Sequence, residues 1–305
     1  MRIWIALWTV YLVWGSTYLA IRYVVETMPV LLSAGVRFFV AGALFAGWLV
    51  VRRGWGALRV TRAELLGCSF VGMALLLGGN GLVSVGEDEG VPSGLAALVI
   101  ATVPLWVIIF RRLGGDRLGR ATPLWVLLGF AGVALLLLPG DRPDAAPIGG
   151  MLILVAAAFS WAAGSYGASR LEIPSDPIRA TSLQMLVGGG ATVIVGLVAG
   201  EGSSVDFGAF SWESILAFVY LVFIGSLCAF TAYAWLLKHA PISQVATYAY
   251  VNPVVAIALG ALFVDEEVTG LMIVAAVVIC ASVAGTIKQE APQPQPAVAE
   301  EPAVA

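Results

Sequence analysis

Arg37 is the residue whose chemistry is most unusual for its surroundings. It follows Pro29 by eight positions in a long apolar stretch, which at a rise of 1.5 Å per residue places it about 12 Å into a helix. An ionisable residue at that depth in a membrane-length stretch is a functional candidate. No Asp or Glu lies clearly inside such a stretch to pair with it, so carbonyls, polar side chains such as Asn80, or a ligand carboxylate would be its partners. Two interpretations stay open: a clamp between helices, and contact with a substrate.

Two prolines mark a second group of candidates. Pro104 and Pro253 fall in the middle of apolar stretches. Proline lacks the backbone N–H, so each removes a helical hydrogen bond and favours a kink. The freed carbonyls would then face a polar cavity, with Thr102 and Asn252 beside them. Interrupted helices at corresponding places in two halves of a chain point to a transporter site, and a static kink that only shapes packing is the alternative.

Aromatic side chains are the third group. Trp14 and Tyr18 lie deep in the first apolar stretch, and Trp161 and Tyr166 lie comparably in the sixth. Ligand pockets commonly combine aromatic walls with few polar groups, so a cavity walled by these rings would accept an apolar or aromatic side chain. Packing or lipid-facing positions are the alternative. The same expectation covers Trp106, Tyr233, Tyr248 and Tyr250.

The acidic residues stand at the edges of the apolar stretches. Glu87 opens one cluster, Glu87–Glu89, and Asp265–Glu267 is another. Carriers driven by protons commonly relay them through Asp, Glu or His inside the membrane. We therefore expect either facilitated, gradient-driven movement or coupling through Glu87. The alternative is that both clusters are solvated turns.

Residue types exclude several chemistries. His239 is the only histidine, so a two-histidine zinc motif is absent. Cys68, Cys228 and Cys280 each stand alone in an apolar run and are interpreted as buried packing residues. The sequence holds no HExxH, no GxSxG and no clustered pair of buried acids, which leaves little for acid–base work. We expect no metal, no cofactor and no enzyme.

Composition places the chain in a membrane. Its 305 residues are 60% hydrophobic and 11% charged, whereas a soluble domain has roughly 45–50% apolar and about 25% charged residues. The net charge of −3 gives no basic stripe for nucleic acid. Apolar runs of about 20 residues predict ten spanning helices and an all-α integral membrane protein. These runs are 3–21, 30–51, 64–85, 92–110, 121–138, 149–169, 178–199, 214–237, 243–264 and 268–287.

The positions of Lys and Arg predict the orientation of these spans. Cytoplasmic loops carry an excess of both residues. Thirteen of the sixteen fall on one side of the ten spans, and only Arg22 and Arg142 fall on the other. Both termini are therefore expected in the cytoplasm. The segment 288–305 has little apolar content and is expected to be a disordered cytoplasmic tail.

The chain also looks duplicated. Five residues of the first half have counterparts of the same type 147 to 149 positions later: Trp14 and Trp161, Arg22 and Arg170, Pro29 and Pro177, Pro92 and Pro241, and Pro104 and Pro253. With five spans each, residues 1–143 and 144–287 would lie in opposite orientations. Inverted repeats are a recurrent plan of secondary transporters, with the substrate site near the midplane.

Short motifs along both halves resemble a known family. They are Trp14-Gly15-Ser16-Thr17-Tyr18, Gly35-Val36-Arg37-Phe38, Gly79-Asn80-Gly81, Val91-Pro92-Ser93-Gly94, Ala101-Thr102-Val103-Pro104-Leu105 and Tyr248-Ala249-Tyr250-Val251-Asn252-Pro253. This set resembles the EamA family of the drug/metabolite transporter superfamily, most closely its YedA-type members. The resemblance covers the whole membrane part and is specific for the family, and much less so for the substrate.

The resemblance implies a ten-helix, two-repeat carrier of a bacterial inner membrane, often an exporter of amino acids or other metabolites. Its partners would be a small-molecule substrate and the lipid bilayer, without nucleic acid, and a monomer would suffice. Transport would proceed by alternating access, in which the two halves rock about a central cavity. The competing interpretation is a membrane sensor or accessory subunit that does not transport.

Overall fold

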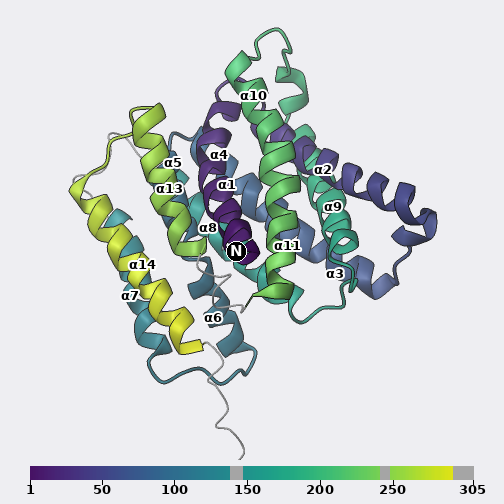
Figure 1. The fold of residues 1–305 in the computed structure, drawn as a ribbon. Coiled ribbons are helices and arrows are strands. Elements are labelled where there is room, and N and C mark those ends of the chain that lie inside the picture. The colour runs from purple at the N-terminus through teal and green to yellow at the C-terminus, as the bar shows by residue number, and fades with distance from the viewer. Residues whose placement is uncertain (138–146, 241–247, 291–305) are drawn as a thin grey trace, which may run out of the picture.

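The computed structural model describes residues 1–137, 147–240 and 248–290, and every regular element within them is helical (Figure 1). The expected tail falls almost wholly outside these residues. The first half contains α1 Arg2–Val25, α2 Val30–Arg53, the 3-10 turn η1 Trp55–Leu58, α3 Arg62–Gly72, the π-helical stretch η2 Met73–Gly81, α4 Leu82–Asp88, α5 Ser93–Ile100, α6 Val103–Leu113 and α7 Thr122–Leu137.

The second half follows a similar order. It contains α8 Ile148–Ala168, α9 Pro177–Val198, the 3-10 turn η3 Glu201–Ser204, α10 Trp212–Tyr220, the π-helical stretch η4 Leu221–Cys228, α11 Ala229–His239, α13 Tyr248–Phe263 and α14 Gly270–Glu290. The spans predicted from the sequence coincide with these helices to within a few residues. The start of the ninth predicted span, 243–247, lies outside the described residues.

Apolar length is the feature that marks these helices as membrane spans. Within the described ranges, seven helical segments are long and apolar enough to cross a bilayer, and three further apolar helices are shorter. The long segments are Arg2–Val25, Val30–Arg53, Arg62–Asp88, Ser93–Leu113, Ile148–Ala168, Pro177–Val198 and Trp212–Tyr233, and the shorter ones are Thr122–Leu135, Val251–Phe263 and Gly270–Thr286. The chain is therefore a multi-pass membrane protein, and ten full crossings stay a prediction.

Two π-helical stretches support the duplication. η2 joins α3 to α4, η4 joins α10 to α11, and their first residues, Met73 and Leu221, are 148 positions apart. That offset agrees with the offsets of the paired residues in the sequence. π-helical stretches are rare and recur at functional sites, so two at matched positions are unlikely products of chance packing.

Helices pack mainly against partners from the other half. α2 lies along α9, α7 along α14, and α5 against α13 (Figure 1). α1 packs against α10, α11 and α13 of the second half, while α8 packs against α3, α4 and α6 of the first. The centre of the bundle is therefore a boundary between the two halves of the chain.

Both ends of the α2–α9 pair are tied by charged residues. Asp176 caps α9 by accepting hydrogen bonds from the Ile178 and Arg179 amides, at 2.9 and 3.3 Å, and it pairs with Arg53 at the end of α2. At the other end, the Glu201 carboxylate accepts from the amides of Leu31 and Leu32, at 3.0 and 2.8 Å. A carboxylate at a helix N-terminus is favoured by the free N–H groups and the helix dipole.

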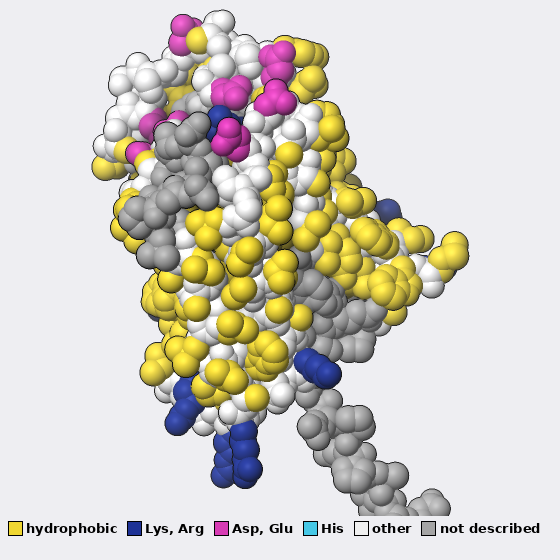
Figure 2. Space-filling model, turned by 90° about the vertical axis from the view of Figure 1, so that its left-hand side faces the viewer, with side chains coloured by type: hydrophobic (Ala, Val, Ile, Leu, Met, Phe, Trp, Pro, Cys, Tyr) yellow, Lys and Arg dark blue, Asp and Glu magenta, His cyan; other side chains and the backbone are white. Residues whose placement is uncertain are grey.

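Charge is separated along the long axis of the bundle. Figure 2 shows Asp and Glu side chains gathered at one end, most of the visible Lys and Arg toward the opposite end, and hydrophobic side chains between them. An apolar belt between two polar ends is the surface that a bilayer requires. Many of the exposed large hydrophobic side chains, including Leu44, Ile194 and Phe223, lie on spanning helices.

Candidate functional site

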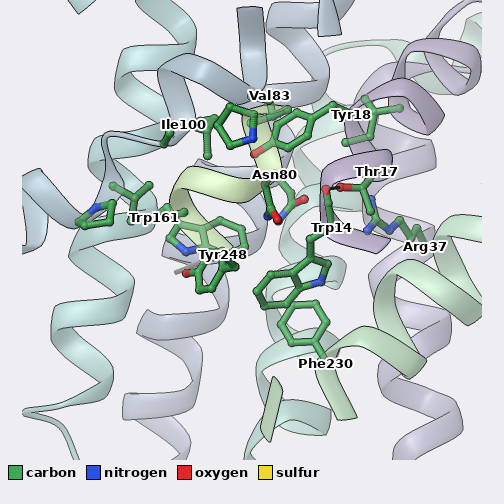
Figure 3. Close-up of a pocket in the computed structure, with 18 residues that line it drawn as sticks. Trp14, Thr17, Tyr18, Arg37, Asn80, Val83, Ile100, Trp161, Phe230 and Tyr248 are labelled. Carbon is green, nitrogen blue, oxygen red and sulfur yellow. Dashed lines mark hydrogen bonds between the residues drawn. The ribbon is translucent and has the colours of Figure 1, made fainter. Parts of the chain in front are cut away.

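A narrow cavity lies at the boundary between the two halves. It has about 80 Å³ of space for the centres of water molecules, and its walls come from six of the seven long spans and from α13. The walls are mostly apolar, with a few polar groups, which is the usual make-up of a small-molecule site. Its lining includes Trp14, Thr17, Tyr18, Ile21, Arg37, Asn80, Val83, Ile100, Pro104, Trp161, Phe230, Tyr248, Asn252 and Pro253 (Figure 3).

Arg37 supplies the positive charge of this cavity. Its side chain is only 4% exposed, lies beside Thr17 (Figure 3), and donates from Nε to the Ser226 hydroxyl at 3.1 Å. Ser226 belongs to η4, so the bond links α2 to the second half. A guanidinium has five N–H donors, and no carboxylate of the described residues forms an ion pair with it. Arg37 can therefore donate hydrogen bonds from its remaining N–H groups to an acceptor inside the cavity.

Trp14 is the centre of the aromatic wall. Its ring centroid lies 5.3 Å from that of Phe230, 5.1 Å from that of Tyr233 and 5.2 Å from that of Tyr248. Such separations are typical of favourable edge-to-face or tilted pairs. Tyr233 does not line the cavity; its ring packs against the rings of Trp14 and Tyr248, which do. The Tyr250 side chain lies outside the described part of the structure.

Polar groups of the cavity are held by backbone carbonyls. The Asn80 amide nitrogen is 3.4 Å from the Leu75 carbonyl, five residues earlier, as the π-helical geometry of η2 allows. The Asn252 amide, turned with nitrogen toward the helix carbonyls, donates to Tyr248 and to Tyr11 of α1, each at 3.2 Å. Each amide is fixed through its nitrogen, so its oxygen is left to accept a hydrogen bond.

The two prolines differ in their surroundings. Pro253 lies inside the continuous helix α13, as predicted. At Pro104 the span is interrupted rather than kinked within a continuous helix: α5 ends at Ile100, and Pro104 occupies the first turn of α6, where its missing N–H has no helical partner to lose. Thr102 sits in the break, buried, and donates to the Val99 carbonyl at 2.7 Å rather than lining the cavity.

Two further aromatics that were predicted to line the cavity, besides Tyr233, lie elsewhere. The Trp106 ring packs against Phe130 and Phe159, at 4.7 and 5.3 Å, in a cluster between α6, α7 and α8. Tyr166 stacks on Phe110 and lies under the Arg170 guanidinium. Both residues lie beyond the cavity in the direction of the basic end. The prediction that they line the cavity was therefore wrong.

Glu87 contradicts the interpretation of its cluster as a solvated turn. Its side chain is 1% exposed, and neither carboxylate oxygen has a hydrogen-bond partner among the described residues. Asp88 and Glu89 are exposed, as expected. The second cluster also has an engaged member, because Glu266 accepts from the Ser93 and Gly94 amides at 2.7 and 3.0 Å and thereby caps α5.

Two other residues of the site have weaker signals in the sequence. Phe230, which packs on Trp14, and Ser226, which bonds to Arg37, were not predicted. Ser226 could have been noticed as a polar residue within an apolar run, at the repeat offset of 148 positions from Gly78. Cys228 is exposed rather than buried, whereas Cys68 is buried as predicted. Within the described residues, no three His, Cys, Asp or Glu side chains gather as a metal site would require.

A sequence model described as the EamA-like transporter family matches residues 2–138 and 148–288, which are the two halves of this chain. The chain belongs to the EamA-like transporter family. This membership agrees with a cavity between two halves of a multi-pass membrane protein.

Proteins similar in sequence are described as belonging to the same class. The chain is 39% identical, over 84% of its length and 80% of the relative's, to an Escherichia coli K12 protein described as the uncharacterized inner membrane transporter YedA. It is 28% identical, over 88% and 89%, to a protein of the same strain described as a probable amino-acid metabolite efflux pump. A solved crystal structure aligns with a TM-score of 0.64 at 20% identity, over 92% of this chain and 96% of that one, which shows the fold alone.

Proposed function

We propose that this protein is an inner-membrane secondary transporter that exports amino acids or related small amphipathic metabolites through the central cavity. The observation that carries the proposal is Arg37, a buried cation with no acidic partner among the described residues, which faces a cavity walled by Trp14 and Tyr248. A substrate carboxylate would accept from the guanidinium, and an apolar side chain would pack on the rings.

Two inverted five-helix repeats, residues 1–143 and 144–287, are the arrangement we propose for the membrane. The basic end of the molecule would face the cytoplasm, together with both termini, since cytoplasmic ends hold the excess of Lys and Arg. The contacts between α2 and α9, α7 and α14, and α5 and α13 support this plan, because each joins helices at equivalent places in the two halves. A monomer contains both repeats and the whole cavity.

Alternating access would use the irregular backbone that surrounds the cavity. Four irregularities lie in its walls or touch them: the break between α5 and α6, Pro253 within α13, the π-helical stretch η2, which contributes Asn80, and the π-helical stretch η4, whose Ser226 bonds to Arg37. Irregular helices near the midplane of a transporter provide both polar contacts and places where halves of helices can pivot. We propose that rocking at these positions exposes the cavity to each side in turn.

Export from cells tests the direction and the substrate class. Bacteria that express the protein are fed dipeptides, which raise the internal amino-acid concentration, and the amino acids that appear in the medium are measured. The proposal predicts faster release of amino acids with apolar or aromatic side chains than from cells expressing Arg37→Gln. Equal release with the active protein, the variant and no protein, at equal membrane expression, would contradict it.

A further inference from the structure

Glu87 is the one fully buried carboxyl group of the described residues, and the substrate contacts proposed above do not use it. It lies in α4, one helical turn beyond Val83, which lines the cavity. Four residues of helix correspond to about 6 Å, so the carboxyl group stands just past the cavity wall, on the side of the acidic end of the molecule. Asp88 and Glu89, the next two residues, are exposed at that end.

The surroundings of Glu87 offer its carboxylate no hydrogen-bond donor. Neither oxygen accepts a hydrogen bond from the described residues, and the adjacent Gly86 packs against the apolar side chain of Leu154 of α8. An ionised carboxylate removed from water without donors is strongly disfavoured, so such a group takes up a proton. In this conformation the side chain is therefore a neutral acid.

Few charged groups face this carboxyl. From α1 they are Arg22 and the phenol of Tyr18, and from the segment before α14 there is Glu266. Glu266 is engaged with the N-terminus of α5, and its charge opposes that of an ionised Glu87. α5 and α8 contain no acidic or basic residue, and Arg37, the charged residue of α2 near the cavity, is bonded to Ser226.

We infer that Glu87 is a proton-binding site that couples closure of the outer end of the cavity to the external pH. The carboxylate takes one proton from the outer solution as that end closes and buries it, and returns the proton when the end reopens and water hydrates the side chain. This inference rests on the proposed function, since it requires a cavity that opens outward at the acidic end. Lower external pH would then favour the closed outer end.

Cysteine accessibility measures this equilibrium without a substrate. Val83→Cys is placed in a background whose three native cysteines are replaced by serine, and intact cells are labelled with a membrane-impermeant maleimide at external pH 6 to 8. Because thiol reactivity itself rises with pH, each rate is divided by the rate of the same cysteine in Glu87→Gln at the same pH. The neutral amide mimics the protonated acid, and Glu89→Gln is the matched control at an exposed neighbour.

The inference predicts that this ratio rises severalfold between pH 6 and 8 and that Glu89→Gln behaves as the unmodified background. A ratio that stays constant with pH, or a Glu87→Gln protein that labels faster than the background at every pH, would overturn it. Equal membrane levels and melting temperatures show that each variant folds. If the labelling ratio rises with pH but the export assay shows no release of amino acids, the proposed substrate class is rejected and the proton site at Glu87 is retained.

Discussion

Gly35 of α2 and Gly189 of α9 face each other across the boundary between the two halves. A Cβ atom on Gly35 would lie 2.9 Å from the Gly189 carbonyl oxygen, and one on Gly189 would lie 2.8 Å from the Gly35 carbonyl oxygen. Small residues at such crossings allow the two backbones to touch in a membrane. The close contact fixes the distance between two helices that belong to different halves.

Gly35→Ala should therefore destabilise the protein, by about 1–3 kcal/mol, because the added methyl group overpacks a contact formed by backbone atoms. Thermal unfolding in detergent measures the change. Gly47→Ala is the control on the same helix, since its added Cβ would meet no atom within 4 Å apart from its chain neighbours and the backbone of its own helix; it should be neutral or stabilise by up to about 1 kcal/mol. Equal melting temperatures for the two variants would argue against the tight crossing.

Arg37→Gln separates the two interpretations of the buried arginine. Loss of a charged hydrogen bond to a substrate carboxylate costs about 1.5–3 kcal/mol, which corresponds to roughly a 10- to 100-fold rise in KM. The matched control is an amine with the same side chain and no carboxylate, whose transport should change little. If transport of both compounds falls equally and the melting temperature also falls, Arg37 only holds α2 to η4 through its bond to Ser226.

Glu201→Gln tests the contact that holds the acidic end of α2. Its carboxylate accepts from two consecutive amides of α2, and the charge complements the helix dipole, so the variant should lose about 1 kcal/mol of stability. Glu172→Gln, at an exposed position with the same charge change, is the control for net charge. The prediction fails if both variants melt at the same temperature.

Asp116 gives the basic end a defined response to acid. Arg170 and then Arg111, which donate to its carboxylate at 2.5 and 3.1 Å, lower the pKa of Asp116. Because the folded pKa lies below the unfolded value, near 4 for aspartate, its stabilisation is complete above that value and is lost as pH falls through the folded pKa. The melting-temperature difference between the native protein and Asp116→Asn should accordingly shrink below about pH 4, and a constant difference would contradict this.

The sequence predicted the helices and the duplication because both depend on local signals. Apolar runs, flanking arginines and paired prolines are visible without knowledge of packing, and the cavity residues Trp14, Arg37 and Asn252 could be selected from them. A residue's surroundings depend on helices that are distant in sequence. Glu87 resembles a turn residue beside Asp88 and Glu89, and only the packing of α1, α5 and α8 around α4 buries it.

Tyr18 and Tyr166 illustrate the limit of arguments from a repeat. They stand at corresponding positions, yet Tyr18 lines the cavity and Tyr166 stacks on Phe110 near Arg170. Duplication fixes where helices lie, while each side chain responds to its own neighbours. A kink and a full break at Pro104 could not be told apart from the sequence, because proline is compatible with both the interior of a kinked helix and the first turn of a new one.

Counterflow in proteoliposomes tests the central claim most directly. Purified protein is reconstituted with a high internal concentration of one unlabelled amino acid and no pH gradient, and entry of the trace labelled compound is followed. The account predicts a transient accumulation for amino acids with apolar or aromatic side chains, which Arg37→Gln reduces for those compounds. If folded protein accumulates no member of an amino-acid panel, transport of this class through the central cavity is contradicted.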